Sequence, residues 1–197
     1  MTKSRDIANS TSTLDVDGGT IKLDGNYPVG TANVALGDTA LDDGSLSGGY
    51  NTAVGAGSLS ANTSGQQNAS FGAYSLDTNT TGSYNAGFGQ SSLGSNTTGS
   101  YNTSLGRGTL SSNTTASGNS AVGYNALTAN TTGEFNTGLG REALEANTTA
   151  NDNTAVGFRA LTSNTTGATN VAVGREALGS NTTGFYNTAV GSDAGAS

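Results

Sequence analysis

Few residues in this chain could do chemistry, and the carboxylates are the first to consider. A glycoside hydrolase needs two acids at nearby positions of a groove, and Glu134, Glu142 and Glu145 come close to that requirement. They fall among polar, turn-like segments, so we do not expect a catalytic groove around them. Histidine and cysteine are absent, which removes the usual general base, zinc ligands and thiol nucleophile. The sequence therefore predicts no enzyme, no catalytic residue, no metal site and no cofactor.

A second group of acids lies near the start of the chain. Asp15, Asp17 and Asp24 suggest a calcium loop, but the D-x-D-x-D-G order and the closing glutamate of such loops are missing. Asp17-Gly18-Gly19 lies between short alternating segments, which is typical of a hairpin turn. We expect a β-hairpin over residues 11–27.

Polar triplets recur farther along the chain. A second asparagine in each repeat, from Asn62 to Asn181, opens Asn-Thr-Thr or Asn-Thr-Ser eight times, and these triplets match the N-glycosylation acceptor pattern. Their threonines also suggest the flat arrays of ice-binding solenoids, although the doublet lies in a turn and not in a T-x-T strand. A structural role for the asparagines explains their spacing without either function.

That spacing is the strongest signal in the sequence. Asparagine, glycine and leucine each recur at every seventeenth position, with the consensus N-T-A-V-G-x-x-A-L-x-x-N-T-T-G-x-Y. The asparagines that begin the repeats are Asn51, Asn68, Asn85, Asn102, Asn119, Asn136, Asn153, Asn170 and Asn187. The leucines are Leu59, Leu76, Leu93, Leu110, Leu127, Leu144, Leu161 and Leu178. Such periodicity predicts an all-β parallel β-solenoid of 17-residue coils.

The local pattern predicts two short strands and two bends in each coil. Thr-Ala-Val before a glycine reads as one strand, Ala-Leu starts a second, and N-T-T-G is a turn. Stacked coils would place the asparagines in two amide ladders. We expect the leucines and a second large apolar position to line the interior. The members of that second position are Val54, Phe71, Phe88, Leu105, Val122, Leu139, Val156, Val173 and Val190.

The domain organisation follows from where the repeat holds. Residues 1–30 are expected to be an N-terminal attachment segment that contains the hairpin. Residues 31–49 read as an irregular first coil, because Gly37 and Leu41 precede their counterparts Gly55 and Leu59 by one residue more than the regular period. Residues 50–197 form the regular solenoid.

Charge and composition limit the partners. The net charge of −7 disfavours nucleic acid, which needs a basic face. No apolar run reaches the ~20 residues of a membrane-spanning helix. Each coil offers only two large apolar side chains, so we expect association of identical rods, a homotrimer that buries alanine-rich strand faces.

Two sets of side chains are expected on the surface. Glu142, Arg159 and Glu176 occupy one position in consecutive coils and predict an exposed line of alternating charge. An aromatic column either packs between subunits or binds carbohydrate. Its members are Tyr50, Tyr84, Tyr101, Phe135 and Tyr186.

The repeat units resemble a known family. The N-[TS]-A-V-G-x-x-A-L units resemble the left-handed parallel β-roll repeats in the heads of trimeric autotransporter adhesins. The 17-residue form with its N-T-T-G turn is similar to repeats in bacteriophage tail fibres and other virion appendages, and the opening KSRDIAN is similar to the start of some marine phage fibres. The resemblance implies a left-handed coil and a trimer.

The phage resemblance sets the functional expectation. An autotransporter adhesin would carry a secretion signal, a coiled-coil stalk and a membrane anchor, and none is read in these 197 residues. We therefore expect a structural phage tail-fibre or virion appendage protein at the virion surface. It would dock to other virion proteins through its N-terminal segment and contact a host-surface glycan or protein. The head fragment of a bacterial trimeric surface adhesin and an ice-binding solenoid are the alternatives.

Overall fold

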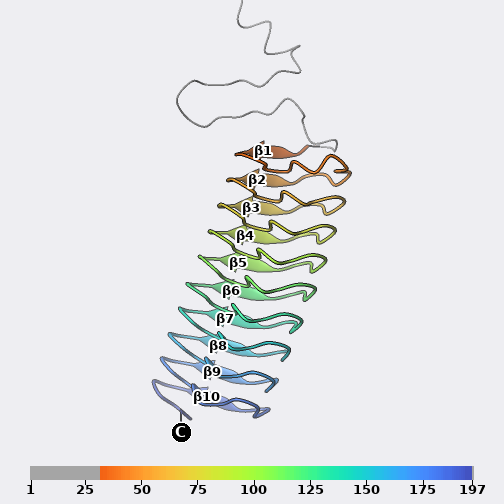
Figure 1. Cartoon of the computed structure of the whole chain (residues 1–197). Helices are drawn as coiled ribbons and strands as arrows, with labels where there is room; N and C mark the ends of the chain where they lie inside the picture. The colour runs from red at the N-terminus through yellow and green to blue at the C-terminus, as the bar shows by residue number, and fades with distance from the viewer. Residues whose placement is uncertain (1–31, 197) are drawn as a thin grey trace, which may run out of the picture.

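The computed structural model describes residues 32–196, and the expected hairpin, the acids before residue 31 and the attachment segment lie outside them. The described part is a stack of similar coils with one short strand in each (Figure 1). Its ten strands form one parallel sheet in chain order, β1 to β10. The parallel β-solenoid of 17-residue coils predicted from the sequence is confirmed.

Every strand of this sheet is short. The bounds are β1 Val34–Leu36, β2 Thr52–Val54, β3 Ala69–Phe71, β4 Ala86–Phe88, β5 Thr103–Leu105, β6 Ser120–Val122, β7 Thr137–Leu139, β8 Thr154–Val156, β9 Val171–Val173 and β10 Thr188–Val190. From β2 onward each residue pairs with its counterpart one repeat later, for example Thr52 with Ala69. Nine steps of ~4.8 Å make the sheet about 43 Å long.

We number the positions of a coil from 1 at the asparagine before each strand to 17 at the residue before the next such asparagine. Positions 2 to 4 are the strand, and position 5 is a glycine that ends it. Gly55, at this position, has φ +130, and an added Cβ would lie 2.6 Å from the carbonyl carbon of Gly72. Only glycine fits there, because both the backbone conformation and the close approach of the next coil exclude a side chain.

The predicted second strand is wrong. The leucines at position 9 have φ between 49 and 54, which is the left-handed helical region and not extended chain. Leu59 is one of them, and the residues around it form turns. A coil this short must reverse direction within a few residues, and these left-handed positions make the corners.

The two columns of large apolar residues that were predicted to line the interior differ in burial. The position 9 leucines are buried; Leu59 to Leu161 are 0% exposed. The position 4 residues, which we expected inside, lie outside: Leu105 is 50% exposed and Val190 71%. That expectation is wrong because strand residues alternate, and the inward residue of each strand is position 3.

Position 3 carries only alanine, serine or glycine, and the space there explains why. Ala53 and Ser70 are 0% exposed. At Gly87 an added Cβ would already lie 2.6 Å from the Oγ of Ser75. The interior is filled by leucines and asparagines, so only small side chains fit opposite them.

The first asparagine column joins neighbouring coils. Asn68 donates from both its backbone N and its Nδ2 to Oδ1 of Asn51, at 3.0 and 3.1 Å. Its Nδ2 also donates to the carbonyl of Gly82, across the same coil, at 2.9 Å. Each such member therefore connects the strand to the previous coil and to the N-T-T-G turn.

The second asparagine column closes the turn. Asn79 Nδ2 donates to Oδ1 of Asn62 at 3.0 Å and to the Gly82 carbonyl at 3.0 Å. The two columns thus meet at one carbonyl in each coil. Within residues 32–196 no buried side-chain nitrogen or oxygen lacks a hydrogen-bond partner. The buried amides are consequently compatible with a solid interior.

The extra residue of the first coil lies in one turn. The backbone hydrogen bonds show that Leu41 corresponds to Leu59, which lies one residue farther along the chain than a regular repeat would place it. Ser47 corresponds to Ser64, which lies one regular repeat later. The insertion therefore falls between Leu41 and Ser47. Leu46, in that segment, is 2% exposed.

Candidate interaction surface

The outward side of the sheet is an uncharged face with a continuous apolar row along position 4. Positions 2 and 4 point out of every coil, and none of their residues is charged from β1 to β10. Position 2 holds threonine, alanine, serine or valine, and position 4 holds valine, leucine or phenylalanine. We call this surface the strand face. Phe71 and Phe88, adjacent on it, stack with ring centroids 4.9 Å apart.

The aromatic column at position 17 borders the strand face. Tyr84 and Tyr101 stack with centroids 4.9 Å apart and planes 3° apart, so each ring covers one face of the other. Tyr101 is 64% exposed and Tyr186 80%. Because stacking covers ring faces on which a sugar would lie, this arrangement favours edge contacts.

Position 6 borders the other side of the strand face, and an alternation of arginine and aromatic residues runs along it. The guanidinium of Arg107 lies 5.8 Å from the Tyr124 ring centroid, and that of Arg141 lies 5.9 Å from Tyr124 and 5.6 Å from Phe158. These distances allow cation–π attraction. Sequence reasoning missed this ladder, although arginines two repeats apart with aromatics between them are a readable signal.

Glu142 lies between arginines and not on an exposed line. Its carboxylate is 2.7 Å from Arg141 Nη2 and 2.7 Å from Arg159 Nε, and its side chain is 8% exposed. Hydrogen bonds from the Arg141 and Arg159 guanidinium groups lower the pKa of Glu142. The expected exposed line of alternating charge is therefore wrong at Glu142. A general acid of glycoside hydrolysis needs a raised pKa, so Glu142 is unsuited to that role.

The asparagines of the N-T-T-G triplets are closed to modification in the folded coil. Asn62, Asn79 and Asn96 are 0% exposed, as are their counterparts up to Asn164. The first threonine of each triplet but the last donates its hydroxyl to the next coil, for example Thr63 Oγ1 to the Thr80 carbonyl at 3.0 Å. The second threonine column differs, and Thr115, for example, is exposed.

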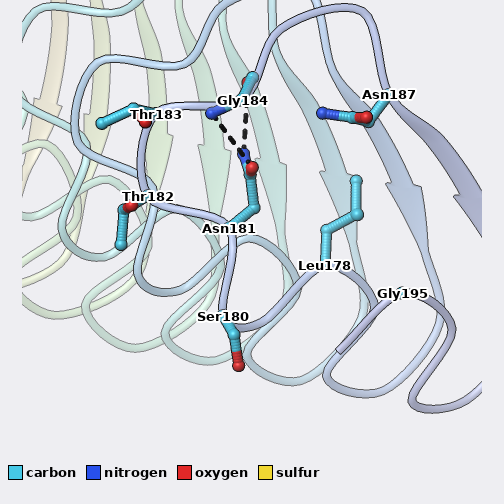
Figure 2. A pocket seen from close by; sticks show the side chains of 8 residues that line it. All are labelled: Leu178, Ser180, Asn181, Thr182, Thr183, Gly184, Asn187 and Gly195. Atoms are coloured by element: carbon cyan, nitrogen blue, oxygen red, sulfur yellow. Dashed lines mark hydrogen bonds between the residues drawn. The ribbon is translucent and has the colours of Figure 1, made fainter. Parts of the chain in front are cut away.

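A shallow pocket lies at the C-terminal end of the stack. Asn181 has no following asparagine, and its Oδ1 accepts from the backbone N of its own Gly184 at 3.1 Å, while its Nδ2 donates to the Gly184 carbonyl at 3.3 Å (Figure 2). The residues that line the pocket are Leu178, Ser180, Asn181, Thr182, Thr183, Gly184, Asn187 and Gly195. Leu178, Asn181 and Asn187 in this lining belong to the interior columns of the coil, whereas Ser180, Thr182 and Thr183 are exposed.

Comparison with known proteins identifies no family. No family model matches the chain, and neither a curated protein nor a solved structure matches it. Among residues 32–196 no helix is long and apolar enough to cross a membrane. No group of three or more acidic residues among them is placed to hold a metal ion.

Proposed function

We propose that this protein is a structural shaft in a phage tail fibre or related virion appendage, built as a homotrimer of left-handed solenoids. The observation that carries the proposal is the strand face, an uncharged surface with an apolar row of valine, leucine and phenylalanine along all ten described strands. Monomeric proteins rarely leave a long apolar surface open to water. The handedness follows the resemblance to adhesin-head repeats.

The dimensions of this surface support self-association. With its flanking positions 17 and 6 the strand face spans six residue steps, about 20 Å, and its length is about 43 Å. The resulting area is on the order of 800 Å² per copy, which a trimer divides between two neighbours, so three copies together would bury roughly 2,400 Å². A second copy has the same axial repeat and therefore matches the strand face coil by coil.

Three parallel copies around an axis would close the assembly and leave no strand face exposed. The trimer axis would then be lined by position 4, in place of the alanine-rich surface that the sequence suggested. A closed rod of this kind suits a mechanical role in a fibre. Its N-terminal segment would dock to other virion proteins, and its outer columns would meet host-surface glycan or protein.

The first test is the oligomeric state. Sedimentation equilibrium should give about three times the chain mass of 19.3 kDa. Leu105→Asp, which places a charge on the strand face, should dissociate the trimer. Thr115→Asp, at an exposed position in the Asn113–Ala116 turn of the same coil, should not. A parent chain that is a folded monomer at micromolar concentration would contradict the proposal.

The second test is location. Gold-labelled antibody against the chain should decorate an appendage of phage particles in electron micrographs. The head of a bacterial surface adhesin would use the same strand face, and label on bacterial cells without phage particles would favour that alternative. Label on neither would remove both.

A further inference from the structure

Packing through the strand face alone would leave the axial alignment of neighbouring copies undetermined. Every coil presents similar outward residues at steps of ~4.8 Å, so a copy that slips by one coil would bury nearly the same apolar surface. A residue that breaks the repeat must therefore select the alignment. The charged residues beside the strand face break it, and they lie at positions 6 and 7 on one edge and 16 and 17 on the other.

One edge is basic. All four arginines of residues 32–196 lie at position 6 or 7, and no lysine occurs in that range. Arg141 and Arg159 belong to consecutive coils, joined by a hydrogen bond from the Arg159 backbone N to the Arg141 carbonyl at 3.0 Å. Their side chains are 61% and 48% exposed, although both contact Glu142. Two arginines and one glutamate leave this group with one net positive charge.

The opposite edge is acidic over the same coils. Glu134 at position 16 and Asp152 at position 17 also belong to consecutive coils, joined from the Asp152 backbone N to the Glu134 carbonyl at 3.1 Å. Asp152 is exposed, and no described coil has a basic residue at position 16 or 17. The acidic and the basic pair therefore have opposite sign and the same step of one coil.

We infer that the arginine-bearing edge of one copy meets the acidic edge of the next copy, with Arg141 and Arg159 facing the partner's Glu134 and Asp152, and that this contact fixes the axial alignment. The inference rests on the proposed homotrimer. In a ring of parallel copies each interface is heterologous, so one edge of the strand face meets the opposite edge of its neighbour. Slippage separates the opposite charges, which disfavours the misaligned assemblies.

A reciprocal charge exchange in the full chain tests the contact. Arg141→Glu and Asp152→Arg should each raise the concentration needed for trimer formation by on the order of tenfold, because like charges then meet across the interface. The double variant Arg141→Glu/Asp152→Arg should restore most of the loss. The control Asp42→Arg makes the same charge change as Asp152→Arg, but at an exposed site away from both edges. It should have no effect on trimer formation.

Sedimentation equilibrium at low ionic strength is the measurement, and circular dichroism checks the fold of each variant. At about 1 M salt, where screening acts within ~3 Å, the single variants should approach the parent. If Arg141→Glu alters the fold, Arg141→Gln replaces it, with a smaller expected loss. A trimeric parent whose single variants associate normally, or whose double variant shows no recovery, would overturn the inference and leave the trimer standing. A monomeric parent would remove the trimer as well.

Discussion

Removal of one buried asparagine in mid-stack should destabilise the rod far more than its size suggests. Asn113 donates from Nδ2 to Asn96 Oδ1 at 2.8 Å and to the Ala116 carbonyl at 3.1 Å, and its Oδ1 accepts from Asn130 Nδ2 at 3.1 Å. Asn113→Ala loses all three bonds and leaves Asn96 Oδ1 buried without a donor. Three bonds at about 1 kcal/mol each, with a penalty of about 1–3 kcal/mol for one buried unpaired acceptor, give roughly 4 to 6 kcal/mol.

Two further variants separate the ladder from the mere loss of side-chain atoms. Asn181→Ala removes the last member of the same column, which is half-buried and has no later asparagine to bond its Oδ1, so water can replace its bonds. We expect about 1 kcal/mol there. Thr115→Ala removes an exposed side chain beside the ladder and should change stability by less than ~0.5 kcal/mol.

The assay is urea unfolding followed by circular dichroism, at one fixed protein concentration, because stability of an oligomer depends on concentration. Asn113→Ala should have the lowest free energy of unfolding of the three variants, Asn181→Ala the next lowest and Thr115→Ala the highest. An Asn113→Ala variant as stable as Thr115→Ala would refute the reasoning, since a buried amide with three bonds would then contribute nothing.

Three other perturbations test the coil itself. Deletion of Asn119–Phe135 removes one whole coil and should only shorten the rod by ~5 Å. Deletion of Asn119–Glu134 misaligns the downstream columns and should lower the melting temperature sharply. An equal loss of melting temperature in both variants would contradict the 17-residue coil. Ala121→Val points into the interior and should cost about 1–3 kcal/mol by overpacking, while Ala86→Val, at outward position 2, should be tolerated, and urea unfolding compares them. The pKa of Glu142 is lowered in the folded protein, so the stability that its carboxylate contributes is complete above about pH 4.3, the ordinary pKa, and is lost as the pH falls through the folded pKa. The melting-temperature difference between the parent and Glu142→Gln should therefore shrink as the pH falls through that range. A difference that stays constant would argue against the ion pairs.

The repeat length and the parallel stack could be predicted because asparagine and glycine have specific backbone roles. Asn51 and Gly55 recur without a slip, and spacing alone then gives the coil. The inside and outside of the strand were predicted less well. Leu105 was assigned to the interior by size, but its parity relative to the inward Asn102 places it outside. Alternation along the strand is a better guide than hydrophobicity in a coil this thin.

The interaction surface was only partly readable. The aromatic column at position 17 was visible in the sequence, since Tyr84 and Tyr101 repeat at the coil period. The arginine ladder was missed because its members alternate between two residue types, and the burial of Glu142 depends on two arginines whose side chains fold over it. Such contacts depend on side-chain conformations that the repeat pattern does not contain.

The asparagine columns also give the rod a direction. In the second column the amide Nδ2 of each later coil points to Oδ1 of the earlier one, as for Asn130 toward Asn113, so the amide dipoles are parallel and reinforce one another along the axis. The two ends of a column are therefore chemically different: one end offers donors and the other acceptors. Asn181 shows the acceptor end, where Oδ1 turns to its own Gly184. A coil added at that end would have to supply donors, so the stack distinguishes its head from its tail by amide polarity.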